Sequence, residues 1–538
     1  MGILLPLIPL AVCVVIWLRG RGSREKGLPP GPPTIPLLGN AHIFPASAPH
    51  FKFTEWARQW GGIYSLKLGS STVVVLTDAA AARDLLDKQS ETTSDRPDFY
   101  IAELVTQGKH MTVSHYNSTW KTMRKAVTTI LTQKAVAEQL PIQQAEALHL
   151  AYNLLRSPQD FYTEAKRFSH SVILSVMYGK RAPRYDAPQT VQFFDCLRDM
   201  NALAEPGASV LIDFFPILKL VPERWAKWKR QCLQLRTMQR ALYGALLGET
   251  EDRLRRGEAN GSYMEVLLGR EKELNMDEDM KLYLGATMLE AGSDTTSIWF
   301  QTFFLVLAAH PEAQKKAQAE IDRVVGEDRM PVPSDLENMP YVRALILELH
   351  RYRPNNPLSI PHATEAPREY NGYFIPPKTM LIVNLWGIFH DPELFEDPEK
   401  FEPERYLRTE SGTKPGVDAS AFRHNLIFGH GRRICPGSHL AESSININVM
   451  NLLWGFNIKP DTDAAGHPLP VDDHDYLGGL APAPAPFKCK IVPRTIAKAK
   501  IIEREYLAAD ETFAKFEVGL SPEEKEFVAK TRVPLSDL

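Results

Sequence analysis

Residues 428–437 read FGHGRRICPG and hold a single cysteine, Cys435, in a loop rich in glycine and arginine. Two glycines bracket the thiol, which lets the backbone turn tightly and leaves room for a flat group against the loop. Arg432 and Arg433 place positive charge close to the sulfur in the sequence, and positive charge favours the thiolate over the thiol. An inert, buried cysteine is the alternative, because free cysteines often behave as small apolar core residues. The regular pattern of the loop favours a thiolate that binds a metal.

A thiolate is the axial ligand that suits a haem iron required to cleave dioxygen, because sulfur pushes electron density onto the metal. The spacing resembles the haem-binding loop of the cytochrome P450 family at its fixed positions, which here are Phe428, Gly431, Arg433, Cys435 and Gly437. The resemblance implies a mainly α-helical fold with a small β region, the cytochrome P450 fold. It also implies haem b (iron protoporphyrin IX) with Cys435 as the ligand of the metal.

Composition sets limits on the other classes of protein. The chain has 538 residues, 44% of them hydrophobic and 24% charged, which is typical of a globular protein. The net charge of −3 gives no reason to expect nucleic acid as a partner. The five cysteines are scattered without a C-x-x-C pair, so they indicate neither a disulfide framework nor a zinc site. Length alone suggests about three or four domains, but helical periodicity from residue 79 to residue 351 favours one large helical domain.

The N-terminus carries a membrane signal. Residues 2–18 contain no charge, and Arg19, Arg21, Arg24 and Lys26 follow. At about 1.5 Å per residue the run covers roughly 26 Å, close to the ~30 Å hydrocarbon core. A cleaved signal peptide is the alternative, but a basic region before the apolar run and a small-residue cleavage site are missing. We therefore expect a transmembrane signal anchor at residues 1–18, in a single-pass protein of the endoplasmic reticulum membrane whose catalytic domain is cytosolic.

Four regions are expected along the chain. After the anchor, residues 19–40 form a basic and proline-rich hinge that prolines keep stiff and extended. The haem domain follows at residues 41–495, with β-branched or apolar strand segments at 72–76, 379–385 and 487–492. Residues 496–538 form a charged helical C-terminal tail, in which Ser521 to Glu524 predicts a capping box. The charge pattern favours a solvated tail, with a partner-binding role as the alternative.

An acid and a base stand one helical turn apart in the sequence ALILELHRY. Glu348 and Arg351 lie on one helix face within an apolar setting, so the pair is expected to be buried. A buried pair needs further hydrogen bonds, which Arg405 in FEPERYL could supply. The order of these motifs before the cysteine loop resembles the buried triad behind the haem in the family. We assign Glu348, Arg351 and Arg405 a structural role.

The segment MLEAGSDTTSIWF, residues 288–300, contains poor helix formers within helical spacing. Gly292 costs up to ~1 kcal/mol in a helix, which suggests a bulge or a side chain that bonds its own backbone. The segment resembles the oxygen-binding groove of the family, which implies that Thr295 hydrogen-bonds iron-bound oxygen and that Asp294 feeds protons. An N-cap at a helix start is the alternative. For Glu290, a surface or packing carboxylate is expected rather than a second relay.

The propionates of a haem need cationic or hydrogen-bonding partners, because a buried carboxylate is costly without them. Trp120 and Arg124 lie one helical turn apart and resemble the propionate-binding helix of the family. Arg433 and His362 match the remaining partners, although His362 could instead be a loop histidine with its own hydrogen bond. Together the motifs resemble fungal microsomal members of the family, as does SDRP at Ser94 to Pro97.

The substrate walls of the family fall on segments that are largely apolar here, which suits a hydrophobic ligand of modest size. These segments are Tyr100 to Met111, Met200 to Leu203, Thr287, Ala291, Asn356 to Ile360 and Leu477 to Leu480. The apolar segment 212–222 could rest on the membrane or lie buried. The sequence DDHD at residues 472–475 is expected to be a solvated turn rather than a metal site.

No flavin motif, phosphate loop or iron–sulfur cysteine set occurs in the chain, so electrons must come from another protein. The resemblance implies NADPH-cytochrome P450 reductase, with cytochrome b5 as a second donor, docking on the basic surface near Arg432. The expected reaction inserts one oxygen atom of O2 into a hydrophobic small molecule, an aromatic compound or a fungal secondary metabolite. A haem-thiolate isomerase or dehydratase, and a haem sensor or non-catalytic binding protein, are the alternatives.

Overall fold

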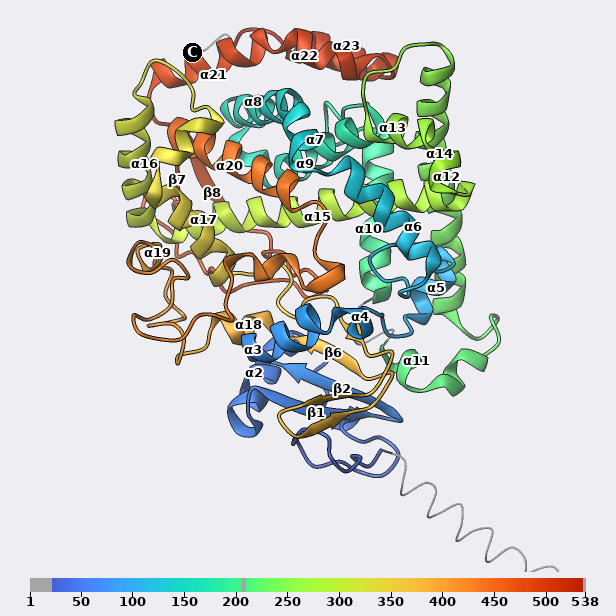
Figure 1. Cartoon of the computed structure of the whole chain (residues 1–538). Helices are drawn as coiled ribbons and strands as arrows, with labels where there is room; N and C mark the ends of the chain where they lie inside the picture. Colours follow the sequence, from blue (N-terminus) through green and yellow to red (C-terminus); the bar gives the residue numbers. More distant parts are fainter. Residues whose placement is uncertain (1–21, 205–209, 536–538) are drawn as a thin grey trace, which may run out of the picture.

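The computed structural model describes residues 22–204 and 210–535 (Figure 1). The expected anchor at residues 1–18 lies outside the described residues and stays a prediction. Within the described part of the chain, no helix combines the length and the apolar character needed to cross a membrane.

A long buried helix, α15 (Glu278–Ala309), runs through the middle of the molecule. It packs most extensively against α9 (Phe161–Tyr178), and α8 (Leu140–Arg156) and α20 (Ser438–Gly455) complete the centre of the helical body. Buried side chains of these four helices belong to one continuous hydrophobic cluster. The predicted class, mainly α-helical, is confirmed.

The other α-helices that the structure describes before the tail are α2 (Pro49–Trp60), α3 (Ala79–Ala82), α4 (Ser90–Thr93), α5 (Tyr100–Thr106), α6 (Ser118–Ile130), α7 (Gln133–Glu138), α10 (Pro188–Ala204), α11 (Val210–Phe214), α12 (Lys227–Arg255), α13 (Tyr263–Gly269), α14 (Glu271–Leu274), α16 (Pro311–Val325), α17 (Pro340–Tyr352), α18 (Leu385–Phe389) and α19 (Arg405–Arg408).

The small β region lies at one end of the helical body, at the bottom of Figure 1. Its main sheet has the order β1 (Ile63–Leu68), β2 (Ser71–Leu76), β6 (Met380–Val383) and β3 (His362–Ala363). β2 and β6 pair in parallel and are almost entirely buried, which explains their unbroken apolar sequences. The strand predicted at 72–76 is confirmed, and the one at 379–385 ends early because α18 begins at Leu385. Two further pairs are β4 (Arg368–Tyr370) with β5 (Tyr373–Ile375), and β7 (Phe456–Pro460) with β8 (Cys489–Pro493), the strand expected near 487–492.

The described part of the predicted hinge, residues 22–40, lies along β1. The guanidinium of Arg24 donates to the hydroxyl of Ser65 at 2.9 Å and to its carbonyl oxygen at 3.1 Å. The Ser65 hydroxyl donates in turn to the carbonyl of Pro29 at 2.6 Å. A Cβ at Gly31 would stand 2.1 Å from the carbonyl oxygen of Ser65, so only glycine permits this approach. The segment is fixed to the sheet, but turns at residues 26–28 and 36–38 interrupt it, so it is not extended throughout as its prolines predict.

The C-terminal tail is part of the core. Its helices α21 (Ile496–Ala508), α22 (Asp510–Glu517) and α23 (Pro522–Thr531) cross the top of the molecule above α8 (Figure 1). The predicted capping box begins α23. Tyr506 stacks on Tyr152 of α8 with ring centroids 4.2 Å apart, and Phe513 is fully buried. The interpretation as a solvated tail is wrong for α21 and α22, because a sparse apolar face within these charged helices packs on α8, whereas α23 has no buried residue.

Candidate active site

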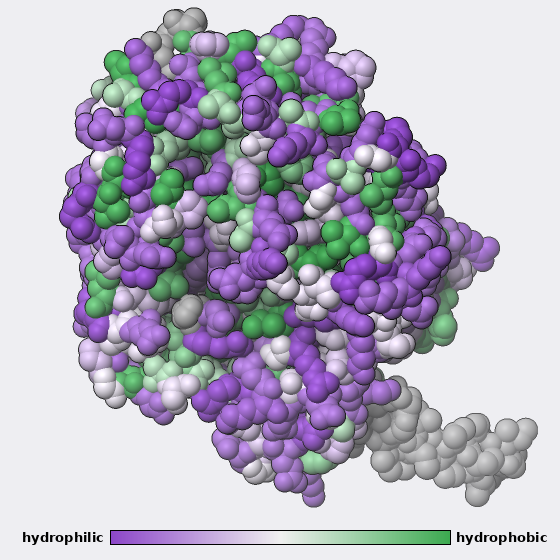
Figure 2. Space-filling model, turned by 45° about the horizontal axis from the view of Figure 1, so that its top comes forward, coloured by the Kyte–Doolittle hydropathy of each residue, from purple (hydrophilic) through white to green (hydrophobic). Residues whose placement is uncertain are grey.

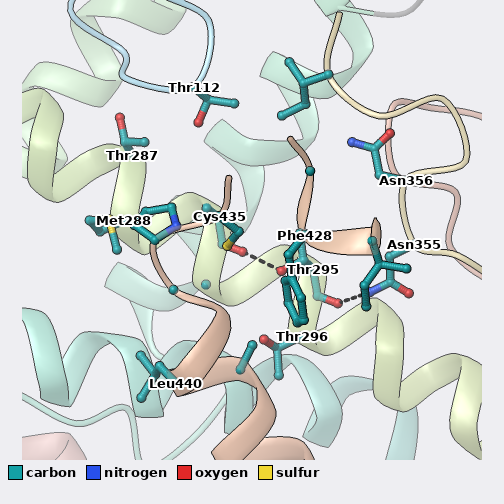
Figure 3. Close-up of a pocket in the computed structure, with 18 of the residues that line it drawn as sticks. Thr112, Thr287, Met288, Thr295, Thr296, Asn355, Asn356, Phe428, Cys435 and Leu440 are labelled. Carbon is teal, nitrogen blue, oxygen red and sulfur yellow. Dashed lines mark hydrogen bonds between the residues drawn. The ribbon is translucent and has the colours of Figure 1, made fainter. Parts of the chain in front are cut away.

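A cavity of about 1730 Å³, counted with its opening to solvent, lies between α15 and the loop that carries Cys435 (Figure 3). Most of the predicted site residues line this cavity: Trp120, Arg124, Thr295, His362, Phe428, Arg433, Cys435 and Gly437. Gly431 and Asp294 do not line it. The structure therefore brings together residues that are up to about three hundred positions apart in the sequence, such as Arg124 and Cys435.

The cysteine loop is closed by its own backbone. The amide of Cys435 donates to the carbonyl of Phe428 at 2.7 Å. Gly431 has φ +53°, and a Cβ there would stand 2.2 Å from the carbonyl oxygen of Leu86. Its amide donates to the Asp87 carboxylate at 2.7 Å. Gly431 thus anchors the loop to the π-helical segment η2 (Arg83–Lys88), which lies far earlier in the sequence. The other face of the loop stays open toward the cavity.

The charge around the sulfur differs from the prediction. Burial raises the pKa of the Cys435 thiol, and the amide of Gly437 and the charge of Arg124 only partly oppose this shift. Arg432 instead hydrogen-bonds the hydroxyl of Tyr116 at the surface. The prediction that Arg432 and Arg433 stabilise the thiolate is wrong, because sequence proximity did not place their guanidinium groups at the sulfur. A metal ion bound to the sulfur would remove the proton that burial otherwise retains.

Two buried arginines in the cavity wall lack a carboxylate partner. Arg433 donates to the carbonyl oxygens of Ser94 at 2.7 Å, Met111 at 3.2 Å and Ser114 at 2.8 Å. Arg96, a residue that the sequence did not single out, donates only to carbonyl oxygens as well. Among the described residues, no carboxylate lies within 4.0 Å of either guanidinium, as the full set of ion pairs shows.

The pKa values of these arginines reflect that imbalance. Burial lowers the pKa of Arg433 to about 9, and burial together with the charge of Arg433 lowers the pKa of Arg96 well below its usual value. The charge of Asp95 opposes both shifts only in part. Positive charge without a counter-ion is costly in such a site unless an anion binds there. The wall therefore fits a group with two carboxylates, as the propionates of haem b have. The sequence feature that could have pointed to Arg96 as a site residue was its place in SDRP, residues 94–97.

The other predicted propionate partners also have donors at this wall. Trp120 donates to the carbonyl of Met111 at 3.1 Å, and the Arg433 guanidinium lies 4.2 Å from its ring centroid. Arg124 donates to the carbonyl of Ile434 at 2.7 Å. His362 lies in β3, where its Nδ1 is 2.8 Å from the carbonyl of Thr93. Burial, then the charge of Arg96, lowers the pKa of His362. His362 has the backbone partner that the alternative expected and it also lines the cavity, so its role toward a propionate stays a prediction.

α15 is continuous through the predicted groove, which rules out an N-cap at this point. The hydroxyl of Thr295 donates to the carbonyl of Ala291 at 2.8 Å, one of the two local reasons expected for poor helix formers here. Gly292 has a separate reason, since a Cβ there would stand 2.8 Å from the side chain of Ile173 on α9. Asn355 donates its side-chain amide to the carbonyl of Thr295 at 2.8 Å (Figure 3).

Asp294 faces away from the cavity. Its carboxylate accepts from the amide of Asn201 on α10 at 3.3 Å. Burial raises the pKa of Asp294, while Asn201 and the charge of Lys166 oppose the shift and Glu290 adds to it. Asp294 therefore holds a proton more readily than an exposed aspartate. Adjacent helical residues point about 100° apart, so Asp294 and Thr295 lie on different sides of α15.

Glu290 is a buried packing carboxylate. It accepts from Tyr243 at 2.5 Å and from Gln239 at 3.1 Å, both on α12, and it lies 3.0 Å from Nε2 of His110. The surface alternative is excluded, since only 6% of Glu290 is exposed. These contacts tie α12 and the segment after α5 to α15.

The residues assigned to the structural triad meet behind the cysteine loop and do not line the cavity. The Glu348 carboxylate lies 2.8 Å from Nε of Arg351 and 3.0 Å from Nε of Arg405. It also accepts from the backbone amide of Glu402 at 2.8 Å. Such further hydrogen bonds are what a buried ion pair requires.

Two other expectations need correction. Of the predicted substrate walls, only Met111, Thr287, Ala291, Asn356, Ser359 and Ile360 line the cavity. Leu477 and Leu480 are exposed instead. Asp473 of the DDHD turn is not solvated, because it accepts from Tyr352 at 2.9 Å and lies 2.8 Å from Nε2 of His310. Within the described ranges, no group of three or more potential metal-binding side chains occurs.

Comparison with known proteins agrees with this site. A family model described as Cytochrome P450 matches residues 29–488. The chain is 39% identical to a cytochrome P450 monooxygenase of Armillaria gallica over 94% of this chain and 97% of that protein. It is 35% identical to one of Arthrobotrys oligospora over 95% and 97% of the two chains. It is 34% identical to the cytochrome P450 monooxygenase macC of Penicillium terrestre over 90% and 93%.

The chain therefore belongs to the cytochrome P450 family. It is an oxidoreductase of the monooxygenase class that uses haem iron. Membership also implies a small-molecule substrate and a redox partner.

Proposed function

We propose that this protein is a membrane-anchored haem-thiolate monooxygenase that inserts one atom of O2 into a hydrophobic small molecule, an aromatic compound or a fungal secondary metabolite. The observation that carries the proposal is the position of Cys435 in a cavity whose opposite wall bears Thr295 and whose side wall bears uncompensated arginines. A thiolate ligand, a hydroxyl and an anion site are the groups that this chemistry needs.

Haem b would be held by the sulfur of Cys435, and its propionates by donors of the cavity wall: Arg96, Trp120, Arg124, His362 and Arg433. Bound there, it would supply the activation of dioxygen and the transfer of oxygen. Phe428 and Gly437 border the same space and would face the macrocycle.

The chain itself supplies protons and a dry pocket. The Thr295 hydroxyl lines the cavity and donates to the Ala291 carbonyl, and a hydroxyl rotor can exchange that bond for one to a ligand. Asp294, with its raised pKa, stores a proton on the other side of the same helix turn. Proton transfer from Asp294 through Thr295 would need a rotation of the Asp294 side chain or a water between them. This role is a prediction for both residues.

The substrate would be apolar over most of its surface. Phe168, Val172, Ile173 and Met288 line the cavity and would exclude water from a bound ligand. None of the described residues in the cavity wall is Asp or Glu. An amine cation therefore has no counter-charge here, which favours neutral substrates.

We place the protein in the endoplasmic reticulum membrane, with the described body in the cytosol. The charge-free run at residues 2–18, followed by basic residues, supports a single span. Segment 212–222 supports a second contact, because Ile217 and Leu220 are 74% and 79% exposed, whereas Ile212 and Phe214 are buried. Trp225, 70% exposed, extends this surface. The face drawn in Figure 2 is mostly polar, with smaller apolar patches among the polar side chains.

Electrons would come from NADPH through NADPH-cytochrome P450 reductase, with cytochrome b5 as a second donor. Arg432 and Lys121 are exposed on the side of the cysteine loop. Both lie against Tyr116, with the Lys121 ammonium 4.5 Å from its ring centroid. This basic surface would dock an acidic partner close to the sulfur, by an attraction that salt weakens.

The test uses the full-length protein expressed with haem, reduced and exposed to carbon monoxide. We expect the red-shifted Soret band of a thiolate-ligated carbonyl complex, and reductase-dependent consumption of O2 with an oxygenated product. Cys435→Ser should abolish the band. Cys489→Ser is the control, since Cys489 lies outside the cavity wall. Purified protein without iron, or with nitrogen-ligated iron, would contradict the proposal.

A further inference from the structure

Several polar side chains that line the cavity have no hydrogen-bond partner among the described residues, and two of them lie above Cys435 in Figure 3. The first is Asn356, from the segment after α17, whose side-chain oxygen is buried and unpaired. The second is Thr112, from the segment after α5: its backbone carbonyl accepts from Arg96 at 2.9 Å, but its hydroxyl has no partner. Figure 3 shows both side chains above Cys435, on opposite walls of the cavity.

The neighbouring polar side chains are committed only in part. Asn355 donates to the Thr295 carbonyl at 2.8 Å, which fixes its amide because an amide oxygen could not face that carbonyl, but its own oxygen is buried and unpaired like that of Asn356. The Thr287 hydroxyl donates to the carbonyl of Tyr283 at 2.7 Å and accepts from the amide of Met111 at 3.2 Å. Free hydrogen-bonding capacity therefore remains at Asn356 and Thr112 in the part of the cavity above Cys435, besides the oxygen of Asn355 and the hydroxyls of Thr296 and Ser359.

From this arrangement we infer that Asn356 and Thr112 form a polar anchor for a hydroxyl group on an otherwise apolar substrate. The inference rests on the proposed function and adds the class of substrate. An unpaired buried amide oxygen costs about 1–3 kcal/mol, and a ligand O–H removes that cost. A hydroxyl both donates and accepts, as do the amide of Asn356 and the hydroxyl of Thr112. An ether or a ketone can only accept, and it leaves the amide oxygen unpaired.

The anchor also orients the substrate. Because Asn356 and Thr112 lie away from Cys435 in the cavity, a hydroxyl bound between them leaves the apolar end of the molecule over the sulfur. Val172, Ile173 and Met288 line the cavity and suit that end. Oxygen would thus enter at a carbon remote from the hydroxyl that the substrate already carries, so a step that forms or unmasks that hydroxyl must precede this one.

The test measures binding to the full-length holoprotein by the spectral shift that a ligand causes when it displaces water at the iron. The probes are 4-phenylphenol, 4-methoxybiphenyl and biphenyl, which share one apolar body. We expect the phenol to bind about five- to tenfold more tightly than biphenyl, and the methyl ether to bind no better than biphenyl. Hydrophobicity alone would favour biphenyl, so a preference for the phenol reports the hydrogen bonds.

Variants assign the preference to the anchor. Asn356→Leu should bring the phenol and biphenyl to within about twofold of each other, with biphenyl binding kept as the check on the cavity. Thr112→Val should lower the preference in part, and it tests the inference independently if Asn356→Leu does not fold. A phenol preference that survives in both variants would overturn the inference, as would equal binding of all three probes by the parent protein.

A last probe distinguishes recognition of the substrate by Asn356 and Thr112 from recognition by the arginines of the cavity wall. Biphenyl-4-carboxylate should bind more weakly than the phenol, because Asn356 and Thr112 carry no charge. If the carboxylate binds most tightly, the arginines recognise the substrate and the inference fails. Failure of the proposed function looks different: the protein would then lack the thiolate–carbonyl Soret band, whatever the probes do.

Discussion

Two of the sets of buried arginines in this molecule, Arg351 with Arg405 and Arg433 with Arg96, differ in one respect. Arg351 donates to three backbone carbonyls, those of Phe389, Pro398 and Lys400, and Arg433 donates to three others. Arg351 also pairs with the fully buried carboxylate of Glu348, whereas Arg433 has no carboxylate partner in the part of the chain that the structure describes. Burial lowers the pKa of both arginines, but the charge of Glu348 reverses the shift at Arg351.

The difference separates arginines that stabilise the fold from arginines that prepare a binding site. Arg351 and Arg405 complete an internal ion network, so nothing remains for a ligand to do. Arg433 and Arg96 hold positive charge at a cavity wall and leave its neutralisation to an anion from outside the chain. The same residue type, buried in both places, thus supports the fold in one place and prepares a binding site in the other.

We call Arg351 and Arg405 the compensated set, and Arg433 and Arg96 the uncompensated set. The largest effect is expected when the compensated set loses the Glu348 carboxylate. Glu348→Gln keeps the shape of the side chain but leaves Arg351 unpaired and Arg405 with only Glu402, 3.9 Å away. We expect the free energy of unfolding to fall by about 3–5 kcal/mol, because breaking a buried pair strands its partner charge. Denaturant unfolding measures this change. Glu312→Gln, which breaks the exposed pair with Lys315, is the control and should cause no measurable change.

Loss of an arginine from the uncompensated set should weaken haem binding rather than the stability of the fold. Arg433→Met removes a buried charge that lacks a counter-ion, so the stability of the haem-free protein should change little. Haem should be lost about ten- to a hundredfold faster, since a hydrogen bond between charged groups contributes about 1.5–3 kcal/mol. Transfer of haem to an acceptor protein measures the loss.

Arg351→Met is the matched variant, because Arg351 also donates to three carbonyls. It should destabilise the haem-free protein strongly, because Glu348 loses half of its compensation. If Arg433→Met destabilises the haem-free protein as much as Arg351→Met does, the distinction between the two sets is wrong.

The compensated set could be predicted from the sequence, and the reason is local. Glu348 and Arg351 stand one turn apart on a helix whose other residues are apolar, so burial and pairing follow from the pattern. The cysteine loop and the strand at 72–76 were predictable in the same way, because short-range spacing determines them.

The uncompensated set could not be predicted in this way. That Arg433 lacks a carboxylate is a property of everything packed around it, including Ser94 and Met111, and no short motif encodes it. The same holds for Arg432, which points to Tyr116 rather than to the sulfur. The tail was misjudged because Tyr506 and Phe513 are few among many charges, and only the surface of α8 shows that they are buried.

A partly buried carboxyl next to the cavity extends the comparison to the opposite charge. Asp294 has a hydrogen bond from Asn201 but no arginine, and burial raises its pKa above the usual value of 3.8. The unfolded chain therefore releases this proton at lower pH than the folded protein, so the free energy of unfolding decreases as pH rises from about 3.8 through the folded pKa. Asp294→Asn removes this cost. The variant should be more stable than the parent protein at neutral pH, and the gain should vanish toward pH 4.

The same substitution should lower product formation by about tenfold or more, if Asp294 supplies protons as proposed. Product formed per electron consumed and unfolding across pH measure the two effects on one variant. Asn201→Ala is the matched control: it removes the donor that opposes the rise in the pKa of Asp294, so it should deepen the pH dependence of unfolding and leave the carboxyl in place. An Asp294→Asn variant that is less stable than the parent protein at neutral pH would contradict this prediction. It would mean that other groups compensate the charge of this carboxylate, as they do for Glu348. Asp294 would then not belong with the groups that the fold keeps unpaired for the reaction.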